Sequence, residues 1–179
     1  MKIDSAPDVI ARTPRLILRR LRANDAALIQ PLADNWEVAK QTANLPFPYG
    51  ELEARNFVDQ ALRAHDAGKE LVFAIVRRHD AALIGLIGLV TDVAPIEIGY
   101  WLGQDYWGCG YASEALQAIQ NYSRETLCSR RIDAVVFDDN AASIRVLIKY
   151  GFTYQERWEE DIPSRGGRRT MLRYQWQAA

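Results

Sequence analysis

Cysteine and histidine are scarce in this chain. Its 179 residues include two cysteines, Cys109 and Cys128, and two histidines, His65 and His79. The cysteines have neither the spacing of a zinc site nor the density of a disulfide framework, so we expect no metal and a reducing, cytoplasmic setting. The histidines are expected at surface positions, one in a helix and one in a turn.

Long apolar runs and an excess of one charge are absent as well. No stretch of about 18 apolar residues occurs, so no membrane-spanning helix is expected. The opening residues MKIDSAPDV lack the apolar core of a signal peptide. The net charge of −1 predicts no general attraction to DNA or to an anionic membrane. With 49% apolar residues, the chain can form the core of one domain.

The stretch IEIGYWLGQDYWGCGYASEAL, residues 96–116, combines a strand pattern, a glycine-rich turn and a helix pattern. Apolar side chains alternate up to Tyr100 and recur at helical spacing after the turn. Unpaired N–H groups at a helix start can hold an anion, and Gly108 and Gly110 would let a phosphate approach the main chain. Spacing alone is equally compatible with a tight turn without a ligand. Ser113 replaces the last glycine of a dinucleotide motif, and no P-loop lysine follows.

The longer string Y-W-G-C-G-Y-A-S-E-A, preceded by E-I-G-Y-W-L, resembles the acetyl-CoA-binding core of GNAT-superfamily N-acetyltransferases. It is most similar to the branch of ribosomal-protein N-terminal (alanine) acetyltransferases. The family motif Gln/Arg-x-x-Gly-x-Gly/Ala maps onto residues 107–112, with Trp107 in place of Gln/Arg. T-P-R-L-I-L-R-R-L at 13–21 resembles the first strand of the branch, and N-A-A-S to K-Y-G-F at 140–152 resembles its last helix and the strand that follows.

The order of the expected elements indicates an α/β (α+β) fold. We interpret residues 1–179 as a single acetyltransferase domain of GNAT type, with a core from about 13 to 175. Its sheet is expected to be mixed and mostly antiparallel, with helices on both faces. Residues 1–12 are expected to form a loose tail and 33–50 an irregular segment. Asn24 and Asp25 are expected to cap the first helix, and Pro31 to kink or end it near Gln30.

The resemblance implies a binding site for the cosubstrate acetyl-CoA. Main-chain N–H groups from Gly108 to Ser113 would hold the pyrophosphate, and the strand at 97–102 would splay from its neighbour and pair with the pantetheine arm. Asn140 is read either as a helix cap or as a ligand of the CoA arm. The cofactor-binding residues expected are Tyr100, Trp101, Leu102, Trp107, Gly108, Cys109, Gly110, Tyr111, Ala112, Ser113, Asn140 and Ser143.

Two residues are candidates for catalysis. Glu97 lies within an apolar strand, where partial burial would raise its pKa, and we expect it to act as a base or as an anchor for the substrate ammonium group. A solvated sheet face is the alternative. Ser143, one turn after Asn140, is a candidate proton donor to the leaving sulfur. Leu147 stands where many family members have a tyrosine, so the general acid is left open, and the thiolate could leave into solvent. Cys109 is read as a bystander.

Residues outside this motif are given mainly structural interpretations. Arg145 is read as part of a solvated helix face, although it could reach CoA phosphates. The basic loop at 165–169 is read as a solvated turn. Trp36, Phe47 and Tyr49 are assigned equally to the floor of an acceptor pocket or to the core.

The resulting hypothesis is an acetyl-CoA-dependent N-acetyltransferase that moves the acetyl group directly to a primary amine. The acceptor is left open among a protein or peptide N-terminus, an aminoglycoside, a polyamine and another small amine; the resemblance favours the N-terminus. A non-catalytic acyl-CoA-binding module is the main alternative, and a nucleotide-binding protein is a weaker one. Neither DNA nor a membrane is expected as a partner, and the protein is expected to be a monomer or a homodimer.

Overall fold

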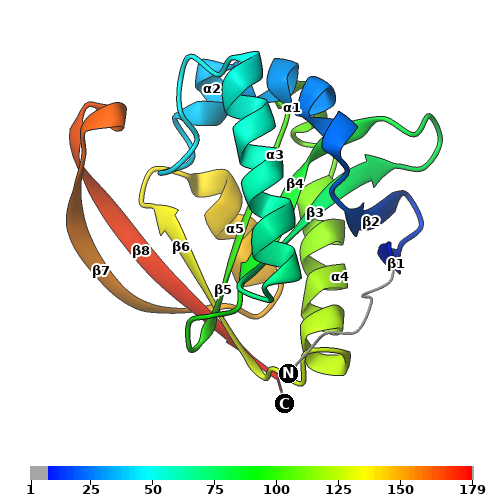
Figure 1. The fold of residues 1–179 in the computed structure, drawn as a ribbon. Coiled ribbons are helices and arrows are strands. Elements are labelled where there is room, and N and C mark those ends of the chain that lie inside the picture. The colour runs from blue at the N-terminus through cyan, green and yellow to red at the C-terminus, as the bar shows by residue number, and fades with distance from the viewer. Residues whose placement is uncertain (1–7, 179) are drawn as a thin grey trace.

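A twisted eight-stranded sheet runs through the protein, and helices pack on both of its faces (Figure 1). The computed structural model describes residues 8–178. The strands are β1 (Val9–Arg12), β2 (Leu16–Arg20), β3 (Glu70–Arg77), β4 (Leu83–Val90), β5 (Ile96–Leu102), β6 (Arg131–Phe137), β7 (Thr153–Ile162) and β8 (Gly167–Gln177). The helices are α1 (Ala26–Ala33), α2 (Trp36–Ala39), α3 (Glu51–Asp66), α4 (Tyr111–Glu125) and α5 (Ala141–Lys149), with short 3-10 helices at Ala23–Asp25, Gln104–Tyr106 and Pro163–Arg165.

The sheet is mixed and mostly antiparallel, as the sequence predicted. Its strand order is β1-β2-β3-β4-β5-β6-β8-β7. Neighbouring strands are antiparallel everywhere except between β5 and β6. A parallel pair needs a crossover connection, and α4 provides it. The glycine-rich turn therefore lies in the connection between the two parallel strands, β5 and β6.

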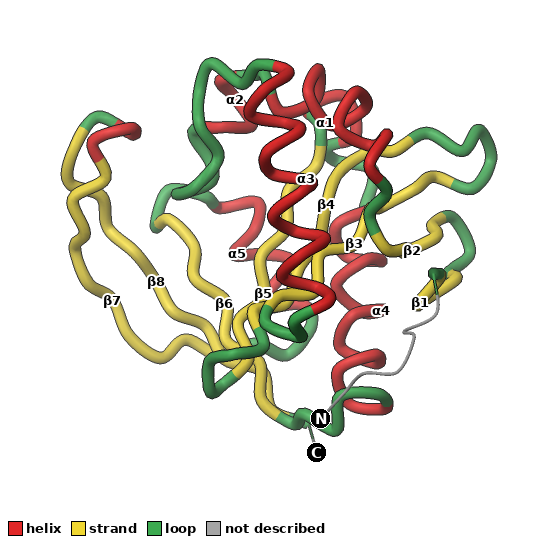
Figure 2. Tube along the Cα trace, viewed as in Figure 1, coloured by secondary structure: helices red, strands yellow, loops and turns green. Residues whose placement is uncertain are grey.

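The two faces of the sheet have separate cores. On the face that we call the front, α1 and α3 pack against Val72, Ala74 and Leu86. On the back face, α4 and α5 pack against a larger cluster that includes Phe73 and Ile98. Figure 2 shows the helices in red on the yellow sheet, with α3 crossing in front of the strands. Because β3 and β4 are covered on both faces, nearly all their residues are buried, which explains their continuous apolar sequence.

Three expectations for the N-terminal third were wrong. Residues 9–12 form β1, which pairs with β2, rather than a tail; the part of the expected tail at 1–7 lies outside the described residues. Helix α1 continues through Pro31 to Ala33, because a proline in the last turn removes only one helical hydrogen bond. The segment at 33–50 contains α2, whose N-terminus is capped where the Asn35 side chain accepts a hydrogen bond from the Glu37 N–H at 2.8 Å.

The expected cap of α1 also takes a different form. The side chain of Asp25 accepts a hydrogen bond from the Arg22 N–H at 2.8 Å, so it closes the preceding 3-10 turn rather than capping α1. It is buried and also pairs with Arg19 through two hydrogen bonds of 2.7 and 2.8 Å. A charge this deeply buried needs such a partner, which the sequence pattern did not predict.

Candidate active site

The structural centre of the site is the point where β5 and β6 separate. Their parallel ladder contains three pairs and ends at Ile98, opposite Ala134. Beyond that point β5 continues along β4 to Leu102, whereas β6 continues along β8 to Phe137. The expected splay of this strand is therefore confirmed. Along the gap, residues 99–102 pair with β4 through one edge of their main chain. Their other edge faces the gap and has no partner strand in the described structure.

A cavity of about 540 Å³ occupies this gap and is lined from both faces of the sheet. Ser143 and Val146 of α5 line it from the back, whereas Val38, Gln41 and Thr42, in and after α2, line it from the front. On β5, Tyr100 belongs to the back core and Trp101 to the front core, and both side chains reach the cavity. The cavity therefore passes through the sheet.

The glycine-rich turn forms the wall of the cavity at the start of α4. Gly108 and Gly110 have positive φ angles of 73° and 78°, which L-residues rarely adopt. A Cβ on Gly108 would meet nothing within 4 Å, so a ligand can reach this main chain. The N–H groups in the first turn of α4 have no partner within the helix. With Arg145 and Lys149 on the same lining, this end of the cavity suits an anionic group.

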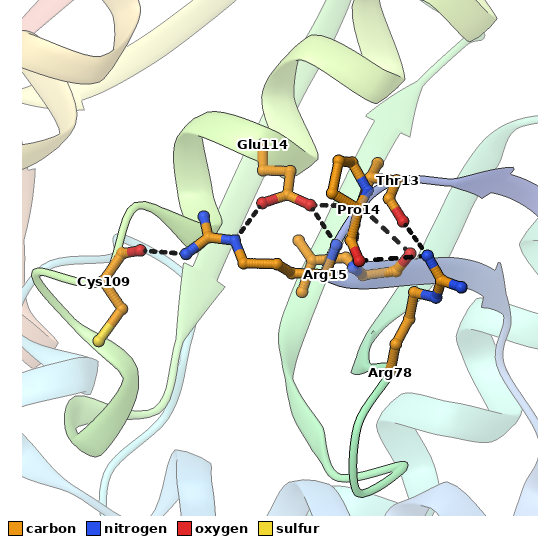
Figure 3. A network of polar contacts seen from close by, with 7 residues as sticks. Thr13, Pro14, Arg15, Arg78, Cys109 and Glu114 are labelled. Carbon is orange, nitrogen blue, oxygen red and sulfur yellow. Dashed lines mark hydrogen bonds and ion pairs between the residues drawn. The ribbon is translucent and has the colours of Figure 1, made fainter.

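A polar network that the sequence did not reveal fixes this helix start (Figure 3). Glu114, in the first turn of α4, accepts hydrogen bonds from the Thr13 hydroxyl, the Arg15 N–H and the Arg15 Nε at 2.5, 2.8 and 2.7 Å. Arg15 also donates to the Cys109 carbonyl at 2.8 Å. Burial alone would raise the pKa of Glu114, but these hydrogen bonds outweigh it and lower the pKa. The segment just before β2 therefore holds the turn in place.

Most of the residues expected at the cofactor line the cavity. They are Tyr100, Trp101, Leu102, Trp107, Gly108, Gly110, Tyr111, Ala112, Ser113, Asn140 and Ser143. Cys109 does not line the cavity. Its side chain is exposed, and only its main-chain carbonyl takes part in the network around Glu114. Trp107 is fixed by a hydrogen bond of 2.9 Å from its indole N–H to the Leu102 carbonyl.

Three side chains meet at the back of the gap. Asn140 caps α5, because its side-chain oxygen accepts a hydrogen bond from the Ser143 N–H at 3.1 Å. The Tyr100 hydroxyl is buried and makes no well-formed hydrogen bond within residues 8–178. Burial raises the pKa of Tyr100 to about 12, an effect that the nearby Ser143 hydroxyl partly offsets. Leu147 is buried in the back core, so position 147 supplies no polar group to the site.

Glu97 lies just before the gap, outside the cavity lining. Its neighbour across the ladder is Asp133, so it points to the face opposite Ile96 and Ile98. Burial raises the pKa of Glu97, Arg173 opposes this effect and Asp133 adds to it. The expected direction of the shift is therefore confirmed, whereas the role of the carboxylate stays a prediction.

Several assignments outside the motif were wrong. His65 is buried against Phe73 rather than exposed, and burial lowers its pKa. Arg165 is buried instead of solvated: it donates to the carbonyls of Thr42, at 2.7 Å, and of Leu45. By contrast, Arg145 is exposed on α5, as expected, and it also lines the cavity. These side chains could not be placed because their environments depend on segments far away in the sequence.

The three aromatic residues of the α2 segment also take separate places. Tyr49 is buried in the front core, whereas Trp36 and Phe47 are partly exposed and pack on each other with centroids 5.4 Å apart. None of the three lines the cavity. Among residues 8–178, no cluster of histidine, cysteine, aspartate and glutamate could hold a metal ion, and no helix is long and apolar enough to span a membrane.

The fold and the site define a class of protein. Residues 15–153 match the family described as acetyltransferase (GNAT) domain. The chain therefore belongs to the GNAT acetyltransferases, a family of acyl-transferring enzymes, and the sequence-based identification is confirmed.

Individual relatives agree with this class. The uncharacterized N-acetyltransferase YoaA of Bacillus subtilis is 35% identical over 153 residues, 80% of this chain and 82% of that protein. The ribosomal-protein-serine acetyltransferase of Escherichia coli is 31% identical over 130 residues, 70% and 71% of the two chains. The structure of RimL, a ribosomal L7/L12 α-N-protein acetyltransferase in complex with coenzyme A, shares the fold with a TM-score of 0.83 and 22% identity, covering 94% of this chain and 97% of that one.

Proposed function

We propose that this protein transfers the acetyl group of acetyl-CoA directly to a primary amine, and that the amine is the N-terminus of a peptide or protein. The observation that carries the proposal is the cavity that passes through the sheet between β5 and β6. It gives a cofactor and an acceptor separate entrances that meet inside the gap. Direct transfer needs no covalent enzyme intermediate and therefore no nucleophilic side chain.

The chain offers groups for each part of acetyl-CoA. The N–H groups from Gly108 to Ser113 bind the pyrophosphate, with Arg145 and Lys149 adding positive charge. The free edge of β5 pairs with the amide groups of the pantetheine arm. A main-chain N–H near Trp101 or Leu102 faces the thioester oxygen and stabilises the charge that develops on it. Acetyl-CoA itself supplies the activated acetyl group.

Proton transfer involves groups on both faces. Glu97 takes the proton of the amine on the front face, helped by the raised pKa that burial gives it. On the back face, the hydroxyls of Tyr100 and Ser143 donate hydrogen bonds to the leaving sulfur. The matched relatives include enzymes whose names specify ribosomal proteins, which supports an N-terminal α-amine as the acceptor.

A thiol-release assay tests this function. Purified protein is mixed with acetyl-CoA and with N-terminal peptides, aminoglycosides or polyamines, and Glu97→Gln is assayed in parallel. We expect CoA release with peptides and at least a ~100-fold loss of kcat in the variant, the lower range of a general base. The wild-type rate should rise with pH through the raised pKa of Glu97, because the base must be deprotonated, and Glu97→Gln should lack this dependence.

Glu70→Gln is the matched control. Glu70 is a partly buried carboxylate whose pKa burial also raises, but it lies at the start of β3, two strands away from β5 and the gap. It should keep the wild-type rate. Tight acetyl-CoA binding without turnover on any amine would support a binding module instead, and absence of acetyl-CoA binding would refute the assignment of the glycine turn.

A further inference from the structure

A single unpaired atom stands out at the front entrance of the cavity. The side-chain oxygen of Gln41 is buried, lines the cavity and has no hydrogen-bond donor within residues 8–178. A buried acceptor without a partner is unfavourable, because it has lost its hydrogen bonds to water and gained none in the protein. An arrangement of this kind is expected where a ligand provides the missing donor.

The position of Gln41 is fixed from two sides. Its N–H donates to the Val38 carbonyl at 3.2 Å, which continues the turn that ends α2. The carbonyl of the next residue, Thr42, accepts from the buried side chain of Arg165, which comes from the tip of the β7–β8 hairpin. The main chain at Gln41 is thus held beside the cavity by contacts within the α2 turn and from the β7–β8 hairpin, so the side chain starts from a fixed point on the lining.

The face on which Gln41 lies identifies the ligand that it meets. The glycine turn, Arg145 and Lys149 lie at α4 and α5, the helices of the back face. A cofactor held there brings only its reactive end into the gap. Gln41 lines the opposite, front entrance, on the same face of the sheet as Glu97. A donor that reaches it from the front belongs to the acceptor.

The charges at the front entrance restrict the acceptor further. Val38, Gln41 and Thr42 carry no charge, and the neighbouring Glu37 is paired with Lys40 at 2.6 Å. The carboxylate on the cavity lining, Asp139, is paired with Arg169 at 2.8 Å. Glu97, on the same face, is required for the amine that reacts. A polyamine or an aminoglycoside would need further free carboxylates for its additional positive charges, whereas a neutral carbonyl suits one N–H group.

We propose that Gln41 is a specificity-determining residue whose side-chain oxygen accepts a hydrogen bond from an N–H group of the acceptor, and that it selects a peptide N-terminus over polycationic amines. This inference rests on the proposed function. It adds the residue by which the front entrance distinguishes one class of amine from another.

Steady-state kinetics on three variants test the proposal. Gln41→Met keeps the length of the side chain but cannot accept the hydrogen bond, so kcat/KM for a peptide acceptor should fall about tenfold. Gln41→Glu keeps an acceptor and adds a charge, so the ratio of kcat/KM for spermidine to that for the peptide should rise about tenfold. The control is Gln60→Met, an exposed position on α3 that should behave as wild type.

The dissociation constant of acetyl-CoA, measured by calorimetry, separates the possible results. An unchanged constant in both Gln41 variants, together with the kinetic changes, supports the proposal. A weaker constant with unchanged acceptor kinetics would mean that Gln41 contacts the cofactor, and this overturns the proposal while the proposed function stands. Unchanged peptide kinetics in Gln41→Met also overturn it. Wild-type protein that acetylates no amine would refute both.

Discussion

At the scale of single residues, the raised pKa of Tyr100 decides what its hydroxyl can do. An ordinary thiol has a pKa of about 8.5, so transfer of a proton from a tyrosine with a pKa of about 12 to a thiolate is uphill by roughly 3.5 pKa units, or about 5 kcal/mol. In the proposed reaction, Tyr100 therefore serves as a hydrogen-bond donor to the leaving sulfur rather than as its acid. The proposal therefore takes the proton of the sulfur from solvent.

The substitution Tyr100→Phe tests this distinction. We expect kcat to fall about tenfold, the value of one hydrogen bond to a charged group, while KM for acetyl-CoA stays within about twofold. The pH dependence of the rate should keep the shape of the wild type, because no titrating acid has been removed. Tyr154→Phe, on the exposed surface of β7, is the control. An unchanged kcat in Tyr100→Phe would contradict the role.

At the scale of secondary structure elements, Glu114 joins α4 to the start of β2. Glu114→Ala removes the acceptor of three hydrogen bonds, so the free energy of unfolding should fall by about 2–4 kcal/mol. Glu125→Ala, on the same helix, removes a surface contact to Arg124 and should change the free energy of unfolding by less than about 0.5 kcal/mol. Chemical denaturation followed by circular dichroism measures both.

The pH dependence of that loss provides a second test. Because the folded protein lowers the pKa of Glu114, its stabilisation is present above the pKa of an unfolded glutamate, about 4.3, and is lost as the pH falls through the lower, folded value. Wild type and Glu114→Ala should thus differ most near neutral pH and converge in acid. A difference that is constant with pH would indicate packing rather than charge.

These elements also define what the sequence could predict. Periodicity and turn residues identified the strand–turn–helix order around Gly108, because these patterns are local. Glu114 and Gln41 went unrecognised, since their partners or the cavity belong to segments far away in the sequence. Pro31 misled for a different reason: in the last turn of α1 a proline removes only one helical hydrogen bond, so the helix continues past it.

At the scale of the whole molecule, binding of acetyl-CoA should increase the free energy of unfolding and therefore the Tm. A ligand at about 100 times its dissociation constant adds about 2.7 kcal/mol, which for a chain of this length raises Tm by roughly 5–10 °C. Gly108→Ala should reduce this shift, because its Cβ would enter the space left for the ligand. It should also lower the Tm of the free protein, since φ is 73° at this position.

Gly166→Ala separates strain from ligand binding. Gly166 has a φ of 85°, and a Cβ added there would also meet no atom within 4 Å, but it lies at the tip of the β7–β8 hairpin and does not line the cavity. It should lower the Tm of the free protein by a similar amount and keep the full acetyl-CoA shift. Equal ligand shifts in both variants would exclude the glycine turn as the binding site. Differential scanning fluorimetry is sufficient for this comparison.

The early end of the β5–β6 ladder has a consequence for solubility. An unpaired strand edge on a protein surface allows other chains to add to it and aggregate. Here the edge opened by the splay lies within the sheet, between α5 on one face and the residues that follow α2 on the other. Because this edge lies inside the sheet and beneath these segments, a neighbouring molecule cannot add a whole strand to it, whereas the end of a single chain can enter through the cavity.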